Sequence, residues 1–171
     1  MLLALNGDRR TIRCTPLSLK AVGIDNGPAH VEIMLTKDGP KMVELGARMG
    51  GDCITTHLVP LSTGIDMIKA TMDICLGQTP DITPKCQKGS AIRFFDAPCG
   101  TITAVEGVEE AKNISGIQEI SFTKQIGDIV ADIGSSSDRV GFAVAQANSA
   151  QEAEAICQKA QHTVVIGFCN A

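Results

Sequence analysis

The stretch from residue 29 to residue 47 leaves fewer folding options than any other part of this sequence. Two alternating segments, 29–36 and 40–47, flank Lys37-Asp38-Gly39. A glycine at the third loop position suits a three-residue hairpin loop that ends in a bulge. The pattern therefore predicts an antiparallel hairpin with four cross-strand pairs, which are Thr36 with Pro40, Met34 with Met42, Glu32 with Glu44 and His30 with Gly46.

Alternation of side chains along the two strands predicts one apolar face and one face that carries charge. The apolar face, which we expect in the core, holds Val31, Ile33, Leu35, Val43 and Leu45. The second face holds His30, Glu32, Met34, Met42 and Glu44, with Arg48 just beyond the strand on the same side.

Glu32 and Glu44 are candidate metal ligands because two carboxylates directly opposite each other, with Cβ atoms about 5 Å apart, repel one another. A hard cation such as Mg²⁺, which takes carboxylate and phosphate oxygens together, removes that repulsion. Arg48 adds a planar fork for a phosphate or a carboxylate. Two alternatives stay open: a solvated outer face with an Arg–Glu ion pair, and a two-residue turn that would place the two carboxylates on opposite faces.

Short helices and short strands follow one another through the rest of the chain, which indicates an α+β fold. A first helix is predicted from Thr15-Pro16 to Gly23, and a second over 65–76 with a stripe of Ile65, Ile68, Met72 and Cys75 or Leu76. A third, over 149–161, is capped by Ser149 and faces inward through Ala150, Ala153, Ile156, Cys157 and Ala160. The predicted strands are 91–95, 101–105, 117–122, 140–145 and 163–166.

Two prolines and little periodicity mark residues 78–88 as a linker. We expect an antiparallel sheet with flanking helices over residues 1–77 and a small β-rich subdomain over 89–171.

Composition excludes several classes of protein. The 171 residues carry a net charge of −4 without a basic stripe, which argues against a nucleic-acid binder. Apolar runs are too short for a membrane span or a signal peptide, so we expect a cytoplasmic protein without membrane partners. Seven scattered cysteines without a C-x-x-C pair exclude a zinc ribbon and favour free thiols in a reducing compartment.

Three strings of the hairpin region carry a family resemblance: Gly27-Pro28-Ala29-His30-Val31-Glu32, Asp38-Gly39-Pro40 and Val43-Glu44-Leu45-Gly46-Ala47-Arg48-Met49-Gly50-Gly51. Together they resemble the C-terminal lobe of ATP-grasp ligases, which include biotin carboxylase, carbamoyl-phosphate synthase and the L-amino acid ligases. The resemblance implies that Glu32 and Glu44 hold Mg²⁺ (or Mn²⁺) on ATP and that Met34 lies under the adenine. It implies that Arg48 faces the acyl phosphate. Gly46 departs from the family, which usually has a metal-binding Asn there.

Residues 88–171 resemble the C-terminal domain of the L-amino acid ligase branch through Ala91-Ile92-Arg93-Phe94-Phe95, Gly100-Thr101-Ile102 and Ser137-Asp138-Arg139-Val140-Gly141. The resemblance implies an ATP-dependent ligase that joins a carboxylate to an amine or thiol through an acyl phosphate. His30, Gly50, Gly51 and His57 are candidate substrate contacts, although a surface position also explains His57.

The lobe that supplies the family's glycine-rich phosphate loop and phosphate-binding lysines has no counterpart in these residues. We therefore expect the chain to be inactive alone and to pair with a separately encoded N-terminal half or to form a homodimer through the face bearing Met34 and Met42. The alternative is a non-catalytic binding or scaffold protein that keeps the ligase fold.

Overall fold

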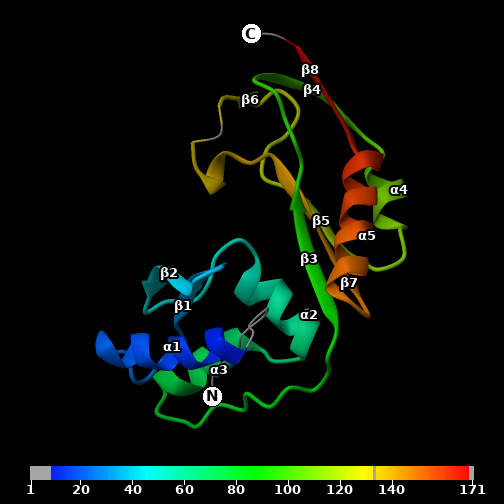
Figure 1. Cartoon of the computed structure of the whole chain (residues 1–171). Helices are drawn as coiled ribbons and strands as arrows, with labels where there is room; N and C mark the ends of the chain where they lie inside the picture. The colour runs from blue at the N-terminus through cyan, green and yellow to red at the C-terminus, as the bar shows by residue number, and fades with distance from the viewer. Residues whose placement is uncertain (1–8, 133, 170–171) are drawn as a thin grey trace. The chain divides into compact units, whose positions relative to one another are not determined.

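The computed structural model describes residues 9–132 and 134–169 and combines helices with antiparallel sheets, which confirms the α+β fold class (Figure 1). The chain divides into two compact units. The first comprises Met1–Pro60 and Ile65–Pro84, and the second comprises Leu61–Gly64 and Lys85–Ala171. No helix within the two described ranges is long and apolar enough to cross a membrane.

The first unit is built on a two-stranded antiparallel sheet against which a helix packs. Its elements, coloured from blue to green in Figure 1, are α1 (Arg9–Ala21), β1 (His30–Thr36), β2 (Gly39–Gly46), the π-helix η1 (Ile54–Leu58), the start of α2 (Val59–Thr63) and α3 (Met67–Cys75).

Helix α1 begins earlier than predicted. It starts at Arg9, so Thr15 does not cap its N-terminus and Pro16 lies inside the helix. Proline holds φ near the helical value, so a helix can continue past it at the cost of one backbone hydrogen bond. The predicted end is confirmed, because the amide of Gly23, with φ 75°, donates to the carbonyl of Lys20 at 3.2 Å.

The turn of the hairpin differs from the prediction. Thr36 pairs with Gly39 rather than with Pro40, so only Lys37 and Asp38 lie between the paired residues. The predicted three-residue loop was wrong, since the hydroxyl of Thr36 donates to the carbonyl of Gly39 at 2.8 Å and closes the tighter turn.

A β-bulge restores the predicted register further along the hairpin. Ile33 pairs with Met42 and Glu32 pairs with Glu44, which leaves Val43 as the extra residue on β2. The predicted pairs Glu32–Glu44 and His30–Gly46 are therefore confirmed, in spite of the two-residue turn.

The bulge also changes which side chains share a face. Met42 pairs with Ile33 and therefore lies on the face opposite to Met34. Met34 pairs with Lys41 instead, so the predicted pair of Met34 and Met42 was wrong. Leu35 and Val43, expected in the core, are exposed. A two-stranded sheet that is covered chiefly by one helix does not bury a whole face.

Helix α3 buries a different side from the one predicted. Asp66 caps it by accepting the amide of Lys69 at 2.8 Å, and the turn at Gly77, with φ 70°, ends it as predicted. The predicted stripe was wrong: Ile65 is buried but precedes the helix, whereas Ile68, Met72, Cys75 and Leu76 are exposed. The buried position is Ala70, whose small side chain allows the close approach with which α3 packs against η1.

The second unit contains two three-stranded antiparallel sheets, with strand orders β3-β7-β5 and β6-β4-β8. Its strands are β3 (Gly89–Phe94), β4 (Gly100–Glu106), β5 (Ile117–Phe122), β6 (Ile129–Val130), β7 (Gly141–Ala147) and β8 (Val165–Cys169), and its helices are α4 (Val108–Lys112), the 3-10 helix η2 (Ser136–Asp138) and α5 (Ala150–Thr163). All five predicted strands are present within a few residues of their predicted bounds, whereas β6, α4 and η2 were not predicted.

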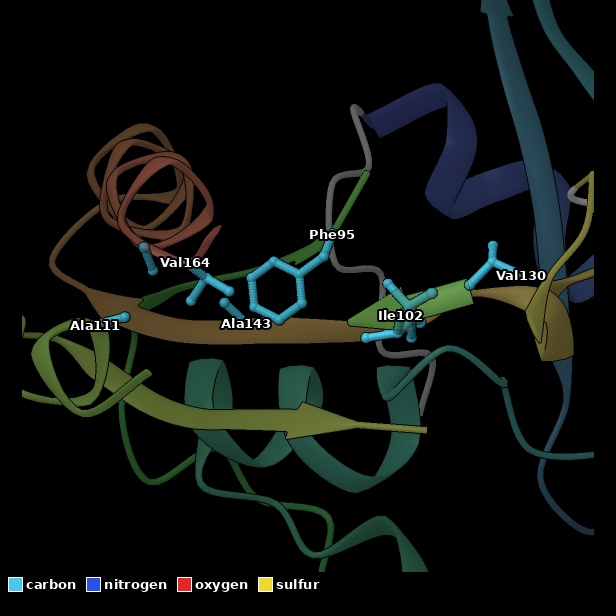
Figure 2. Close-up of a cluster of buried hydrophobic side chains, with 8 residues drawn as sticks. Phe95, Ile102, Ala111, Val130, Ala143 and Val164 are labelled. Carbon is cyan, nitrogen blue, oxygen red and sulfur yellow. The ribbon is translucent and has the colours of Figure 1, made fainter. Parts of the chain in front are cut away.

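Helix α5 lies against β3 and β7 and buries Ala153, Cys157 and Ala160, as predicted, while Ala150 is exposed because it stands at the first turn. The amide of Glu152 donates to the hydroxyl of Ser149 at 3.2 Å, which confirms the predicted cap. Figure 2 shows the core cluster to which α5 contributes Ala160: Phe95, Ile102, Ala111, Val130, Val140, Ala143, Ala160 and Val164. Phe122 packs against this cluster, and its ring stacks on the ring of Phe95 with the two centroids 5.1 Å apart.

Candidate functional site

The centre of the candidate site is the pair of carboxylates on the hairpin. Glu32 and Glu44 are direct cross-strand partners, and their side chains are 53% and 52% exposed. Each is engaged by a neighbouring side chain: Nε2 of His30 lies 3.0 Å from Oε1 of Glu32, and Nη2 of Arg48 donates to Oε1 of Glu44 at 2.8 Å. The Arg48–Glu44 ion pair, which the sequence analysis left open as the alternative to a metal site, is present and partly offsets the repulsion between the two carboxylates.

Arg48 is held loosely enough to change partner. Its second nitrogen, Nη1, donates to the carbonyl of Met49 at 3.1 Å, and its side chain is more than half exposed. An exposed ion pair of this kind contributes about 0–1 kcal/mol. The guanidinium can therefore exchange Glu44 for a phosphate or a carboxylate at little cost.

His30 joins the carboxylate pair to the loop that follows β2. Its side chain is only 16% exposed, and a Cβ atom at Gly50 would lie 3.0 Å from its Nδ1. The loop thus packs against the ring that contacts Glu32. A histidine held in this way fixes the orientation of the carboxylate beside it.

The loop after β2 contains strained backbone that the sequence did not indicate. Asp52 and Cys53 have φ values of 48° and 61°, in the left-handed region that non-glycine residues seldom adopt. The π-helix η1 follows directly, and the hydroxyl of buried Thr55 donates to the carbonyl of Gly50 at 3.0 Å. Strained residues and π-helical turns both concentrate at functional sites.

Two further predicted residues flank this loop. A Cβ atom at Gly51 would meet nothing within 4 Å, so the backbone there is open to an approaching molecule. His57 lies in η1, where its Nδ1 is 2.7 Å from the hydroxyl of Thr56. The structure therefore places both in the segment adjoining His30.

Metal-ligating side chains within the described residues do not form a complete cage. Nowhere in residues 9–132 and 134–169 do three His, Cys, Asp or Glu side chains group to hold a metal ion. Two opposed carboxylates, however, match the donor set of Mg²⁺, which is bound through one or two carboxylates together with substrate phosphates and water.

Met34 provides the apolar part of the same face. It follows Glu32 by two residues on β1 and is 61% exposed. Its cross-strand partner is Lys41, a residue that the sequence analysis did not select because the three-residue loop placed Met42 there.

Comparison with known proteins shows which proteins the chain is similar to. Residues 93–168 match the family model of the L-amino acid ligase C-terminal domain 2. The L-arginine-specific L-amino acid ligase of Bacillus subtilis is 30% identical over 146 residues, which are 82% of this chain and 35% of that protein.

Two of the solved structures that share the fold illustrate the range of similarity. The L-amino acid ligase from Bacillus licheniformis has a TM-score of 0.82 at 24% identity, over 98% of this chain and 45% of that one. The biotin carboxylase domain of the Hydrogenobacter thermophilus 2-oxoglutarate carboxylase, solved with MgADP, ADP and bicarbonate, has a TM-score of 0.65 at 18% identity, over 96% of this chain and 37% of that one.

In sequence and fold the chain is similar to the C-terminal portion of L-amino acid ligases and other ATP-grasp ligases, as the hairpin motif indicated. The part that matches a family model, residues 93–168, matches the C-terminal domain 2 of the L-amino acid ligases. The chain spans about a third of the length of the curated relatives that it matches, 32% and 35%.

Proposed function

We propose that this chain supplies the magnesium–nucleotide face of a ligase that activates a carboxylate as an acyl phosphate and transfers the acyl group to an amine or thiol. The observation that carries the proposal is the direct pairing of Glu32 with Glu44 on one face of the hairpin. The relative named as L-arginine-specific suggests an amino acid as one substrate.

Glu32 and Glu44 fit a Mg²⁺ or Mn²⁺ ion that is shared with ATP phosphates, because both present exposed carboxylate oxygens at one position of the sheet. When bound, the ion neutralises the charge of the transferring phosphoryl group. Gly46, across from His30, contributes no side-chain ligand.

Other side chains of the chain would bind and position the remaining parts of the substrates. Arg48 binds the anionic acyl phosphate when it leaves Glu44, and His30 holds the Glu32 carboxylate in place. Met34 offers a polarizable apolar surface to the adenine ring. Gly50, Gly51 and His57 lie in the segment that the second substrate approaches.

A polypeptide of these 171 residues is proposed to lack turnover by itself, because no glycine-rich loop with lysines is present in them to cover the phosphates. An N-terminal ATP-grasp half, or a second copy of the chain, is the proposed partner. Dependence on ATP and free thiols favours the cytoplasm.

Titration with Mn²⁺ tests the proposal directly. Wild-type protein, Glu32→Gln, Glu44→Gln and the control Glu110→Gln, which removes an exposed carboxylate of the second unit, are compared by isothermal titration and by the Mn²⁺ resonance signal. Both hairpin variants are expected to lose affinity about tenfold or more, while the control keeps it. Equal binding by all four proteins would overturn the metal site.

The alternative, a non-catalytic binding protein with a ligase fold, is favoured by one observation, namely that Arg48 already pairs with Glu44. A wild-type protein that binds neither Mn²⁺ nor ADP would support this alternative.

A further inference from the structure

The β-bulge at Val43 brings an unexpected cation onto the face of the two carboxylates. With Val43 as the extra residue, Lys41 pairs with Met34, and Met34 stands two residues from Glu32 on β1. Cross-strand partners and residues two apart along a strand point to the same side of the sheet. Lys41 therefore shares a face with Met34, Glu32 and Glu44.

Lys41 is the charged group on this face that has no partner within the described parts of the chain. Glu32 is engaged by His30 and Glu44 by Arg48, whereas no side chain or carbonyl in residues 9–132 and 134–169 accepts a hydrogen bond or forms an ion pair with the exposed ammonium of Lys41. A free ammonium on a flexible four-carbon stem can reach a ligand that lies over the hairpin.

Spacing along the strands limits what that ligand contacts. Residues advance about 3.3 Å each along a strand, so Met34 lies about 7 Å from Glu32. A nucleotide with its base over Met34 and its phosphates at the carboxylate pair would pass directly beside Lys41. Of the parts of such a molecule, a phosphate oxygen is the natural partner of an ammonium, since lysine binds phosphate as a point charge.

We propose that Lys41 binds a phosphate oxygen of the nucleotide and selects nucleotides over nucleosides; this inference rests on the proposed ATP-dependent function. The competing explanation is a solvated charge that keeps the free edge of β2 from pairing with other chains. Lys37 provides a matched control because it lies in the turn of the same hairpin and carries the same charge.

Titrations of the full chain with ADP plus Mg²⁺, and separately with adenosine, distinguish a phosphate contact of Lys41 from a solvated charge at the edge of β2. Amide ¹H–¹⁵N spectra are suitable because they detect weak binding and report at the same time that each variant is folded. Lys41→Gln is expected to weaken ADP binding by roughly three- to tenfold and to leave adenosine unchanged. Lys41→Arg should keep most of the affinity for ADP, and Lys37→Gln should match the wild type.

The possible outcomes test the role of Lys41 separately from the nucleotide site itself. Equal affinity of wild type and Lys41→Gln for ADP would overturn the role of Lys41 while leaving the nucleotide site standing. A parallel loss of ADP and adenosine affinity would show that Lys41 supports the base or the fold rather than a phosphate, which also overturns its proposed role. Absence of ADP binding by the wild type would overturn both the role of Lys41 and the proposed function.

Discussion

Gly50 packs against the imidazole of His30 so closely that a Cβ atom at residue 50 would lie 3.0 Å from Nδ1 of the ring. The same Cβ atom would lie 3.2 Å from Cγ2 of Ile54 at the start of η1. The ring in turn lies 3.0 Å from Glu32 through Nε2. The absence of a side chain at residue 50 thus allows the loop to close on the histidine that positions a proposed metal ligand.

Gly50→Ala is therefore expected to destabilise the protein by about 1–3 kcal/mol, since the added methyl group overpacks the contact between loop and ring. Urea denaturation measures the loss, and Mn²⁺ titration measures the effect on Glu32. Gly51→Ala is the control, because its Cβ atom meets nothing within 4 Å. Equal urea midpoints for Gly50→Ala and Gly51→Ala would show that the loop accommodates the added methyl group without a loss of stability.

The pairing of Glu32 with Glu44 could be predicted from the sequence, although the path of the chain between them could not. A three-residue loop, and a two-residue turn followed by a bulge, give the same register beyond Val43. The two arrangements differ only near the turn, where Lys41 rather than Met42 faces Met34. Sequence pattern does not distinguish them, because Asp38-Gly39 suits either turn.

Elsewhere the limits of prediction follow from packing. Five of the six strands described in the second unit were predictable because alternation and glycine-rich turns mark them clearly, whereas two-residue β6 is too short to show a pattern. The buried side of α3 was not, because small Ala70, rather than the large apolar residues, makes the close contact. No sequence signal marks Asp52 and Cys53 as left-handed, since neither is glycine.

The thiol of Cys157 is expected to resist alkylation in the folded protein. Burial raises its pKa to about 11, and its Sγ lies 3.4 Å from the carbonyl oxygen of Ala91. At pH 8 only about a thousandth of such a thiol is thiolate, the reactive form. Iodoacetamide treatment followed by peptide mass spectrometry should modify exposed Cys75 and Cys169 well before Cys157. Labelling of Cys157 at the same rate as Cys75 would contradict this environment, and denaturant should abolish the difference.

Asp138 is expected to stabilise the second unit in a pH-dependent manner. The hydroxyl and the amide of Ser135 and the amide of Gly134 donate to its carboxylate, and these hydrogen bonds lower its pKa from the ordinary 3.8. The unfolded chain therefore binds the proton more tightly than the folded one. The stabilisation is complete above about pH 5 and disappears as the pH falls below 3.8 through the folded-state pKa.

Asp138→Asn should accordingly lower the melting temperature at pH 7 and have little effect near pH 3. Thermal unfolding followed by circular dichroism at both pH values measures the difference. Glu110→Gln, at an exposed carboxylate of the same unit, controls for the loss of a negative charge elsewhere on the surface. A deficit of equal size at both pH values would mean that the turn depends on the shape of the side chain and not on its ionisation.

Arg48→Gln is expected to strengthen the binding of Mn²⁺ alone, in contrast to the loss expected from Glu44→Gln. The guanidinium of Arg48 donates to Oε1 of Glu44 at 2.8 Å, so in the free protein it competes with a metal ion for that carboxylate. An exposed ion pair contributes about 0–1 kcal/mol, so its removal should raise the affinity by up to about fivefold. Lys37→Gln makes the same change of net charge at the turn and separates this effect from long-range electrostatics. Weaker Mn²⁺ binding by Arg48→Gln than by Lys37→Gln would show instead that Arg48 holds Glu44 in the conformation that binds the ion.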